Sequence, residues 1–473
     1  MKRAMTHALK LLAAALLGCT LLAAPALAQS GASFDDTAKL LAGLPVQAGS
    51  PLARYAEDRA WQQHATVMNK TWGDLEKRQL SPIRTWSQAN LTARRPVTFY
   101  FFSGPDYLYV DSFFPDSDVY VLAGLEPTGG LPDLQKLRTG THGAEYTKLR
   151  TSLRSLLNLS YFITREMDSD LRASQLRGTL PILYAFMARA GKTIHDVSFV
   201  TLDPDGTERP DSGDKSAARG VKIVFSGAGG RRQILYYFRT DLSNGGLVRN
   251  GFLAFCDKLG IGDVFIKAAS YLLHGAAFSQ TREFLLKHGA SIVQDDTGIP
   301  LRFLEQRKWG LHPFGEYVGP IPLFSGHYQR SMQVLFHRLD APSIDFGVGY
   351  RWRPNQSHVL LAVNRDAPAP AAASPQPSPA LNVQPATAVE KPAAAPRKET
   401  AGTTGEAAKA EGVTADKKVD SAVSKRPATS IRTAESDNAI ALSWLFVQAL
   451  MIGCLIWGVL AFFAGRENPA GRA

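Results

Sequence analysis

An uninterrupted apolar run near the carboxyl terminus constrains this chain more than any other feature. Residues 439–464 contain no charged side chain, and a helix of this length crosses a bilayer core of roughly 30 Å. Glu435 and Asp437 precede the run and Arg466 follows it, in agreement with the tendency of basic residues to stay in the cytoplasm. We therefore predict a single transmembrane helix, followed by a short cytoplasmic tail, residues 465–473.

The first 28 residues have the pattern of a secretory signal peptide. Lys2, Arg3 and Lys10 precede an apolar stretch, and the small-x-small sequence Ala-Leu-Ala at residues 26–28 ends it. We predict cleavage after this triplet, which places the body in the periplasm or outside and the helix in the inner (cytoplasmic) membrane as a single pass. The alternative is lipid attachment at Cys19, but it leaves further apolar residues at the start of the mature chain.

The composition changes twice between these two ends. Residues 29–95 form a helical amino-terminal segment, because their apolar residues recur at steps of three and four. Residues 96–365 mix strand and helix patterns and form the predicted extracytoplasmic body. Residues 366–438 are rich in Ala, Pro, Ser, Thr, Lys and Glu and cannot bury enough apolar surface to fold. We predict a disordered linker there, with a root-mean-square span on the order of 50 Å.

The body's patterns favour an α/β fold, with α+β as the alternative. β-prone or apolar runs predict strands at 97–102, 107–110, 119–122, 197–202, 221–225, 233–238, 333–338, 345–351 and 359–363. Periodic apolar residues predict helices at 144–162, 176–190, 251–259 and 279–288. The pattern leaves residues 264–272 undecided, and residues 309–323 look irregular. Because strands and helices alternate loosely, we expect helices on both faces of a mixed sheet.

Charge and cysteine content limit the partners. The formal net charge is +11, and the body's share is a mild basic excess, compatible with an anionic envelope polymer or a membrane surface. No block of Lys and Arg is interleaved with aromatic residues, so we expect no nucleic acid. Cys256 is the one cysteine outside the two apolar ends, and its apolar neighbours predict a buried, inert thiol without a disulfide.

Known catalytic and cofactor motifs are missing from the sequence. No G-x-S-x-G elbow occurs, and Gly191-Lys192-Thr193 lacks the first glycine of a phosphate loop, so we expect no nucleotide. No H-E-x-x-H or cysteine pair occurs, so we predict no metal and no cofactor. The isolated acidic residues Asp106, Asp111, Asp116 and Asp118 are interpreted as turn residues.

The strongest acidic segment is Gln294 to Pro300. Asp296-Thr297-Gly298 looks like the active-site triplet of aspartic proteases, but polar residues precede it and no second copy lies on an apolar loop. The alternative is a turn in which an aspartate accepts backbone hydrogen bonds. As candidate catalytic residues we name Asp295, Asp296, His274 and His327. We expect His274, Lys267 and Arg302 to converge on a cleft with Asp295 and His327.

Two functions are compatible with this sequence. The first is a membrane-anchored, non-enzymatic binding or interaction module of the bacterial cell envelope, whose partner is an envelope polymer or another envelope protein. The long linker and the missing catalytic motifs favour it. The second is a membrane-tethered periplasmic hydrolase with an Asp/His site built from the four candidates.

Overall fold

The computed structural model describes residues 32–369, apart from residue 160 and residues 162–173, 212 and 214–217. The predicted signal peptide, most of the linker, the transmembrane segment and the cytoplasmic tail lie outside the described residues. Within the described part, no helix is both long enough and apolar enough to cross a membrane. The topology at the two ends of the chain therefore stays a prediction.

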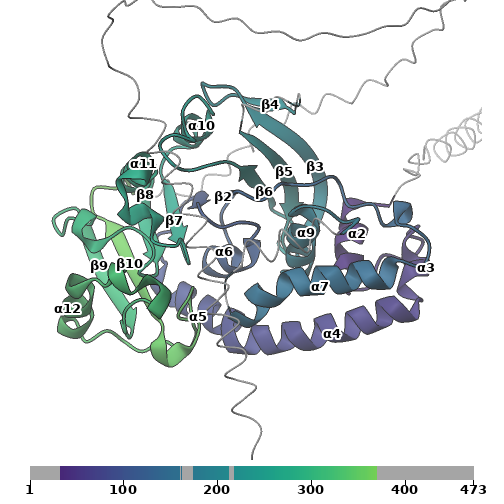
Figure 1. Ribbon diagram of the computed structural model, residues 1–473, viewed down its shortest axis with the longest axis horizontal. Coiled ribbons are helices and arrows are strands. Elements are labelled where there is room, and N and C mark those ends of the chain that lie inside the picture. The colour runs from purple at the N-terminus through teal and green to yellow at the C-terminus, as the bar shows by residue number, and fades with distance from the viewer. Residues whose placement is uncertain (1–31, 160, 162–173, 212, 214–217, 370–473) are drawn as a thin grey trace, which may run out of the picture. The chain divides into compact units, whose positions relative to one another are not determined.

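The described part of the body is built on one ten-stranded mixed sheet (Figure 1). The five central strands run parallel in the order β6-β2-β1-β7-β8. The strands outside them, β4-β3-β5 on one side and β10-β9 on the other, run antiparallel. The strands are β1 Val97–Tyr100, β2 Val119–Gly124, β3 Thr193–Leu202, β4 Glu208–Pro210, β5 Arg219–Ser226, β6 Arg232–Arg239, β7 Gly262–Ile266, β8 Gly289–Gln294, β9 Trp309–Gly315 and β10 His358–Asn364.

Helices cover both faces of this sheet, which confirms the α/β class. One core cluster joins the sheet to α2, α4, α5, α6, α7 and α9, and the other joins it to α10, α11 and α12. The helices are α2 Phe34–Leu41, α3 Ala53–Ala56, α4 Arg59–Leu75, α5 Ser81–Asn90, α6 Tyr107–Phe113, α7 His142–Leu159, α9 Leu180–Arg189, α10 Phe252–Lys258, α11 Ser279–His288 and α12 Arg330–Arg338. Short 3-10 turns are η2 Leu134–Lys136, η3 Leu272–His274, η4 Ala276–Phe278, η5 Leu301–Phe303, η6 Pro322–His327 and η7 Pro354–Gln356, and η1 Glu76–Leu80 is a π-helical turn between α4 and α5.

The central strands are apolar on both sides because both of their faces are covered. Successive side chains of a strand point to opposite faces. Phe99 and Val121 accordingly enter the core under α10 and α11, while Tyr100 and Leu122 enter the core under the helices of the other face. This explains why residues 97–102 read as a continuous apolar run rather than as an alternating one.

The helical amino-terminal segment packs on the same core as the sheet. In α4, Trp61, Ala65, Met68 and Leu75 are buried, which is the face that their spacing predicts. The Trp61 indole donates to the Leu40 carbonyl (3.0 Å) and ties α4 to α2. Figure 1 shows α4 running alongside α7. The apolar face of α4 is therefore packed within the body.

Two of the predicted strands are wrong, because they are helices. Residues 107–110 belong to α6, where the Asp106 carboxylate accepts from the Tyr109 amide (3.2 Å) and caps the first turn. Residues 333–338 belong to α12, which buries Met332, Leu335 and Phe336 at helical spacing. Side-chain capping and one-sided burial outweigh the β propensity of these segments.

The carboxyl-terminal third of the body differs further from the expectation. Residues 345–351 form a loop with an isolated bridge between Val348 and Arg351, not a strand. Residues 309–315, expected to be irregular, are the edge strand β9. The undecided segment 264–272 begins in β7 and continues into a loop, and β8 was not predicted. The predicted pair of strands around residues 226–230 is confirmed as the antiparallel pair β5–β6.

Cys256 lies on α10 and is fully buried. It forms no disulfide, and burial raises the pKa of its thiol well above the ordinary value. The prediction that this cysteine is buried is therefore confirmed. A protonated thiol is a poor nucleophile, and its inertness stays a prediction.

Candidate functional site

The chain crosses the sheet in a way that singles out one location for a site. From β1 the chain passes to β2 on one side, whereas β7 is added later on the other side of β1. In open α/β sheets, ligands bind beyond the carboxyl ends of the strands at such a reversal of strand order. The carboxyl edge around β1, β7 and β8 is therefore the first place to look for function.

Buried ionisable residues follow the strands at this edge. Asp106 follows β1, Lys267 follows β7, and Asp295 and Asp296 follow β8, and each is at most 4% exposed. Charged residues are seldom fully buried unless they are paired. Such a concentration of buried ionisable groups in one place is a feature of functional sites.

Asp106 and Lys267 form a buried ion pair with an N–O distance of 2.7 Å. The Asp106 carboxylate also accepts from the Tyr100 hydroxyl (2.8 Å) and from the Tyr109 amide. The Lys267 ammonium lies 3.8 Å from the centre of the Tyr109 ring. Burial lowers the pKa of Lys267, and the charge of Asp106 opposes this effect. The pair links the loop after β1 to the loop after β7.

The backbone at this edge is held in an unusual conformation. Phe102 just after β1, and Ala268, Ser270 and Tyr271 just after β7, all have φ between 50° and 60°. Left-handed conformations cost non-glycine residues of order 1–3 kcal/mol each and cluster at functional sites. The two loops flanking the reversal of strand order both store such strain.

Asp295 has a structural place in the site. One carboxylate oxygen accepts from the Ala268 amide (2.9 Å), and the other accepts from the amide (3.0 Å) and the hydroxyl of Thr297. Burial, followed by the charge of Asp296, raises the pKa of Asp295 to about 6. Asp295 therefore ties the loop after β7 to the loop after β8, as in the alternative interpretation of a hydrogen-bonded turn.

Asp296 lies among groups that can exchange protons. Its carboxylate accepts from the Tyr271 hydroxyl (2.7 Å), and its amide donates to Nε2 of His358 (3.0 Å), which lies 3.5 Å from the carboxylate. Burial raises the pKa of Asp296, but His358 and the Tyr271 hydroxyl outweigh burial, so that the pKa lies below its ordinary value. Because Nε2 of His358 already accepts from the backbone, we regard Tyr271 as the donor that stabilises the ionised carboxylate. Neighbouring carboxyls with opposite pKa shifts are suited to different roles.

His274 and His327 lie next to Tyr271. The His327 ring stacks on the Tyr271 ring (centroids 4.6 Å apart, 10° between planes), and the His274 ring meets both edge-on at 5.1 and 5.4 Å. Burial, followed by the charge of His327, lowers the pKa of His274 to about 4, and burial lowers the pKa of His327. Both imidazoles are therefore neutral at pH 7, and each offers one donor and one acceptor. His327 is exposed to solvent.

The structure brings three of the four candidate residues around one tyrosine that the sequence did not single out. Asp296, His274 and His327 contact Tyr271, while Asp295 is bonded within the loops. Arg302 reaches this group only through the His274 carbonyl (3.1 Å), and Lys267 pairs with Asp106.

Sequence reasoning missed Asp106, Tyr271 and His358. Asp106 was interpreted as a turn residue, and Tyr271 lies in the segment whose type was undecided. His358 directly precedes the predicted strand 359–363. A signal was available for Asp106, because a polar residue just after a buried strand lies at the functional edge of an α/β sheet.

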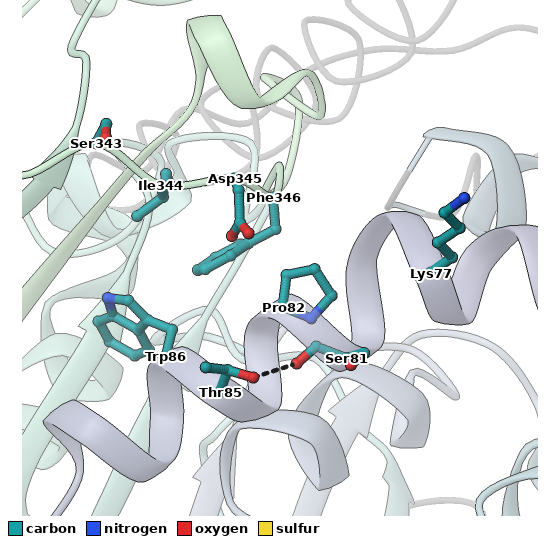
Figure 2. A pocket seen from close by; sticks show the side chains of 9 residues that line it. All are labelled: Lys77, Ser81, Pro82, Thr85, Trp86, Ser343, Ile344, Asp345 and Phe346. Carbon is teal, nitrogen blue, oxygen red and sulfur yellow. Dashed lines mark hydrogen bonds between the residues drawn. The ribbon is translucent and has the colours of Figure 1, made fainter.

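A separate hollow of about 400 Å³ lies between η1, α5 and residues 343–346 (Figure 2). Its charged lining residues are Lys77 and Asp345, and Trp86 and Phe346 are buried in the adjoining core. The lining residues are Lys77, Ser81, Pro82, Thr85, Trp86, Ser343, Ile344, Asp345 and Phe346. No group of converging ionisable side chains lines this hollow, so we place the functional site at the carboxyl edge instead.

Among the described residues, no group of three or more His, Cys, Asp or Glu side chains is arranged to hold a metal ion. The expectation of a site without a metal stays a prediction. The comparisons with known proteins add no family: no family model, no curated protein and no solved structure matches the chain.

Proposed function

We propose that this protein is a membrane-tethered, extracytoplasmic binding protein of the bacterial envelope whose α/β body takes its ligand at the carboxyl edge of the sheet. One observation carries the proposal. Asp106, Lys267 and Asp296 are buried beyond the ends of β1, β7 and β8, and the loops after β1 and β7 have strained backbone. A body that served only as a rigid spacer would not need buried charges and strain in the same place.

The tether is the other half of the proposal. A linker of residues 366–438 between body and membrane would let the body reach partners on the order of 50 Å from the bilayer. An envelope polymer or a second envelope protein is the kind of partner that such a reach suits.

The proposed topology predicts how the protein partitions between fractions. We expect the full-length chain to stay in the membrane pellet through an alkaline carbonate wash and to be released by detergent, because residues 439–464 span the bilayer. A matched variant that ends after residue 369 should appear in the periplasmic fraction. Recovery of the uncleaved full-length chain in a soluble fraction without detergent, or protection of the body from protease in spheroplasts, would contradict the proposal.

The proposed site predicts a selective effect of Asp296→Asn. This change keeps the shape of the side chain and removes its charge, so the Tyr271 hydroxyl loses its ionised acceptor. In a strain that lacks the gene, we expect the Asp296→Asn chain to fold and to reach the membrane. We expect it to complement the phenotype of the deletion less than a tenth as well as the wild-type chain does. The matched control is Asp263→Asn, a buried carboxyl at the start of β7 that accepts from the Arg95 amide and the Ser291 hydroxyl. Full restoration by Asp296→Asn would show that the site lies elsewhere.

A second candidate function, a tethered hydrolase, is favoured by the contacts of Asp296. An ionised carboxylate bonded to a tyrosine, with two neutral imidazoles nearby, is suited to general acid–base work. Ser270, a serine with strained backbone in the loop after β7, pairs with the Tyr350 hydroxyl (2.8 Å) rather than with an imidazole. The hydrolase hypothesis predicts that Asp296→Asn abolishes the formation of product while ligand binding persists. The binding hypothesis predicts that ligand binding itself is lost.

A further inference from the structure

Six rings from four separate segments make a continuous aromatic band over the loops of the candidate site. Neighbouring centroids lie 4.9, 5.3, 5.1, 4.6 and 5.4 Å apart along the band. Contacts of this length are those of packed aromatic pairs. In order, the band consists of Tyr161, Tyr350, Phe324, Tyr271, His327 and His274.

Hydrogen bonds fasten this aromatic band to the buried Asp296 and to the loop after β7. The Tyr271 hydroxyl donates to Asp296, and the Tyr350 hydroxyl pairs with Ser270 (2.8 Å) and donates to the Ala268 carbonyl (3.2 Å). Tyr271 and Phe324 are buried, whereas His327 is exposed. A ligand from solvent therefore meets the His327 ring first, with the His274 edge and the acidic loops behind it.

We propose that the ligand at this site is a saccharide without net negative charge. The inference rests on the proposed function and names its ligand class. A pyranose ring has a face of C–H groups, which packs on aromatic rings, and a rim of hydroxyls, which need donors and acceptors together. The neutral and exposed imidazole of His327 supplies both kinds of group beside the aromatic band.

The charges at the site decide between classes of saccharide. Asp296 is ionised, the ammonium of Lys267 is engaged by Asp106, and the guanidinium of Arg302 is engaged by the His274 carbonyl. An anionic sugar would bring a further negative charge next to buried carboxylates, which disfavours it. Neutral, N-acetylated or amino sugars meet no such penalty.

Calorimetric titration of the full-length protein in detergent micelles tests this inference. The probes are the tetramer of N-acetylglucosamine, its deacetylated cationic counterpart, tetragalacturonate as the anionic saccharide, and choline as a small cation that also binds aromatic rings. We expect binding of the neutral or the cationic tetramer and at least tenfold weaker binding of tetragalacturonate.

Substitution of the exposed ring should weaken this binding. Aromatic contacts of this kind correspond to a factor of about two to ten in affinity, so we expect His327→Ala to reduce it about fivefold. The matched control is His337→Ala, an exposed imidazole on α12, which should leave binding unchanged. Three results would overturn the inference: no saccharide binds at millimolar concentration, tetragalacturonate binds best, or choline binds and the saccharides do not.

The saccharide inference and the proposed function fail separately. If Asp296→Asn fails to complement the deletion strain and no saccharide binds, the proposed site stands and the saccharide inference is wrong. Saccharide binding that survives both Asp296→Asn and His327→Ala would place the saccharide outside this site.

Discussion

Replacing Lys267 with methionine should destabilise the body by about 3–5 kcal/mol, because it leaves the buried Asp106 carboxylate without its cation. Both side chains are at most 2% exposed, so water cannot take the place of the ammonium. Tyr100 and the Tyr109 amide would remain as donors to Asp106, but neither carries a compensating charge. Chemical denaturation of the full-length protein in detergent, followed by tyrosine and tryptophan fluorescence, measures the loss.

Two further variants show whether the uncompensated charge is the cause. Adding Asp106→Asn to Lys267→Met should recover most of the lost free energy, because asparagine is neutral and caps a helix about as well as aspartate. Lys70→Met breaks an ion pair with Asp74 whose side chains are 78% and 60% exposed, and exposed pairs of this kind contribute little. If Lys267→Met is as stable as wild type, or the double variant is no better than the single one, the pair does not hold these loops together.

Gly349→Ala should cost about 2–5 kcal/mol and disturb the site at the same time. Gly349 has φ +60°, where a Cβ atom costs roughly 1–2 kcal/mol. The new methyl group would also overlap the Asp295 carboxylate and crowd the Ala268 amide, and overpacking typically adds 1–3 kcal/mol. Because Asp295 holds the loop that carries Asp296, we expect weaker ligand binding as well as a lower unfolding midpoint.

Gly191→Ala separates the two parts of this cost. Gly191 has φ +70° with open space around it, so alanine there should cost only the backbone part, about 1–2 kcal/mol. Thermal unfolding of the two variants should therefore differ clearly. Equal midpoints would mean that the loop around Gly349 moves away from Asp295 without penalty.

Local patterns predicted the elements whose partners are near in sequence. The pair β5–β6 and the helices α7, α10 and α11 lie close to where the sequence placed them. A turn between two β-prone runs, or a repeated apolar spacing, can be recognised within the segment itself, without knowledge of distant residues. The segment Gln333 to Arg338 shows where this fails. Val334, Leu335 and Phe336 are consecutive apolar residues, and only the 53% exposure of Val334 reveals that one face of a helix is buried.

Part of the site could also be anticipated. The acidic segment after β8 and the two histidines were candidates because of their chemistry, and three of them do surround Tyr271. Asp106, Tyr271 and His358 were not candidates, because each lies in a segment whose local pattern carries no sign of the others. The parallel pairing of β1 with β7 and of β7 with β8 brings the loops of Asp106 and Tyr271 to the acidic segment, and the antiparallel pairing of β10 with β8 brings His358 there.

By itself, the sequence determined the α/β class, the division of the chain by composition and the absence of familiar catalytic motifs, since all of these depend on residue types and their spacing. The tertiary structure decided the order of the strands, and with it the reversal between β1 and β7, the Asp106–Lys267 pair and the aromatic band. The physical reason is that strand order is set by hydrogen bonds and packing between residues far apart in the chain. No local pattern records those contacts.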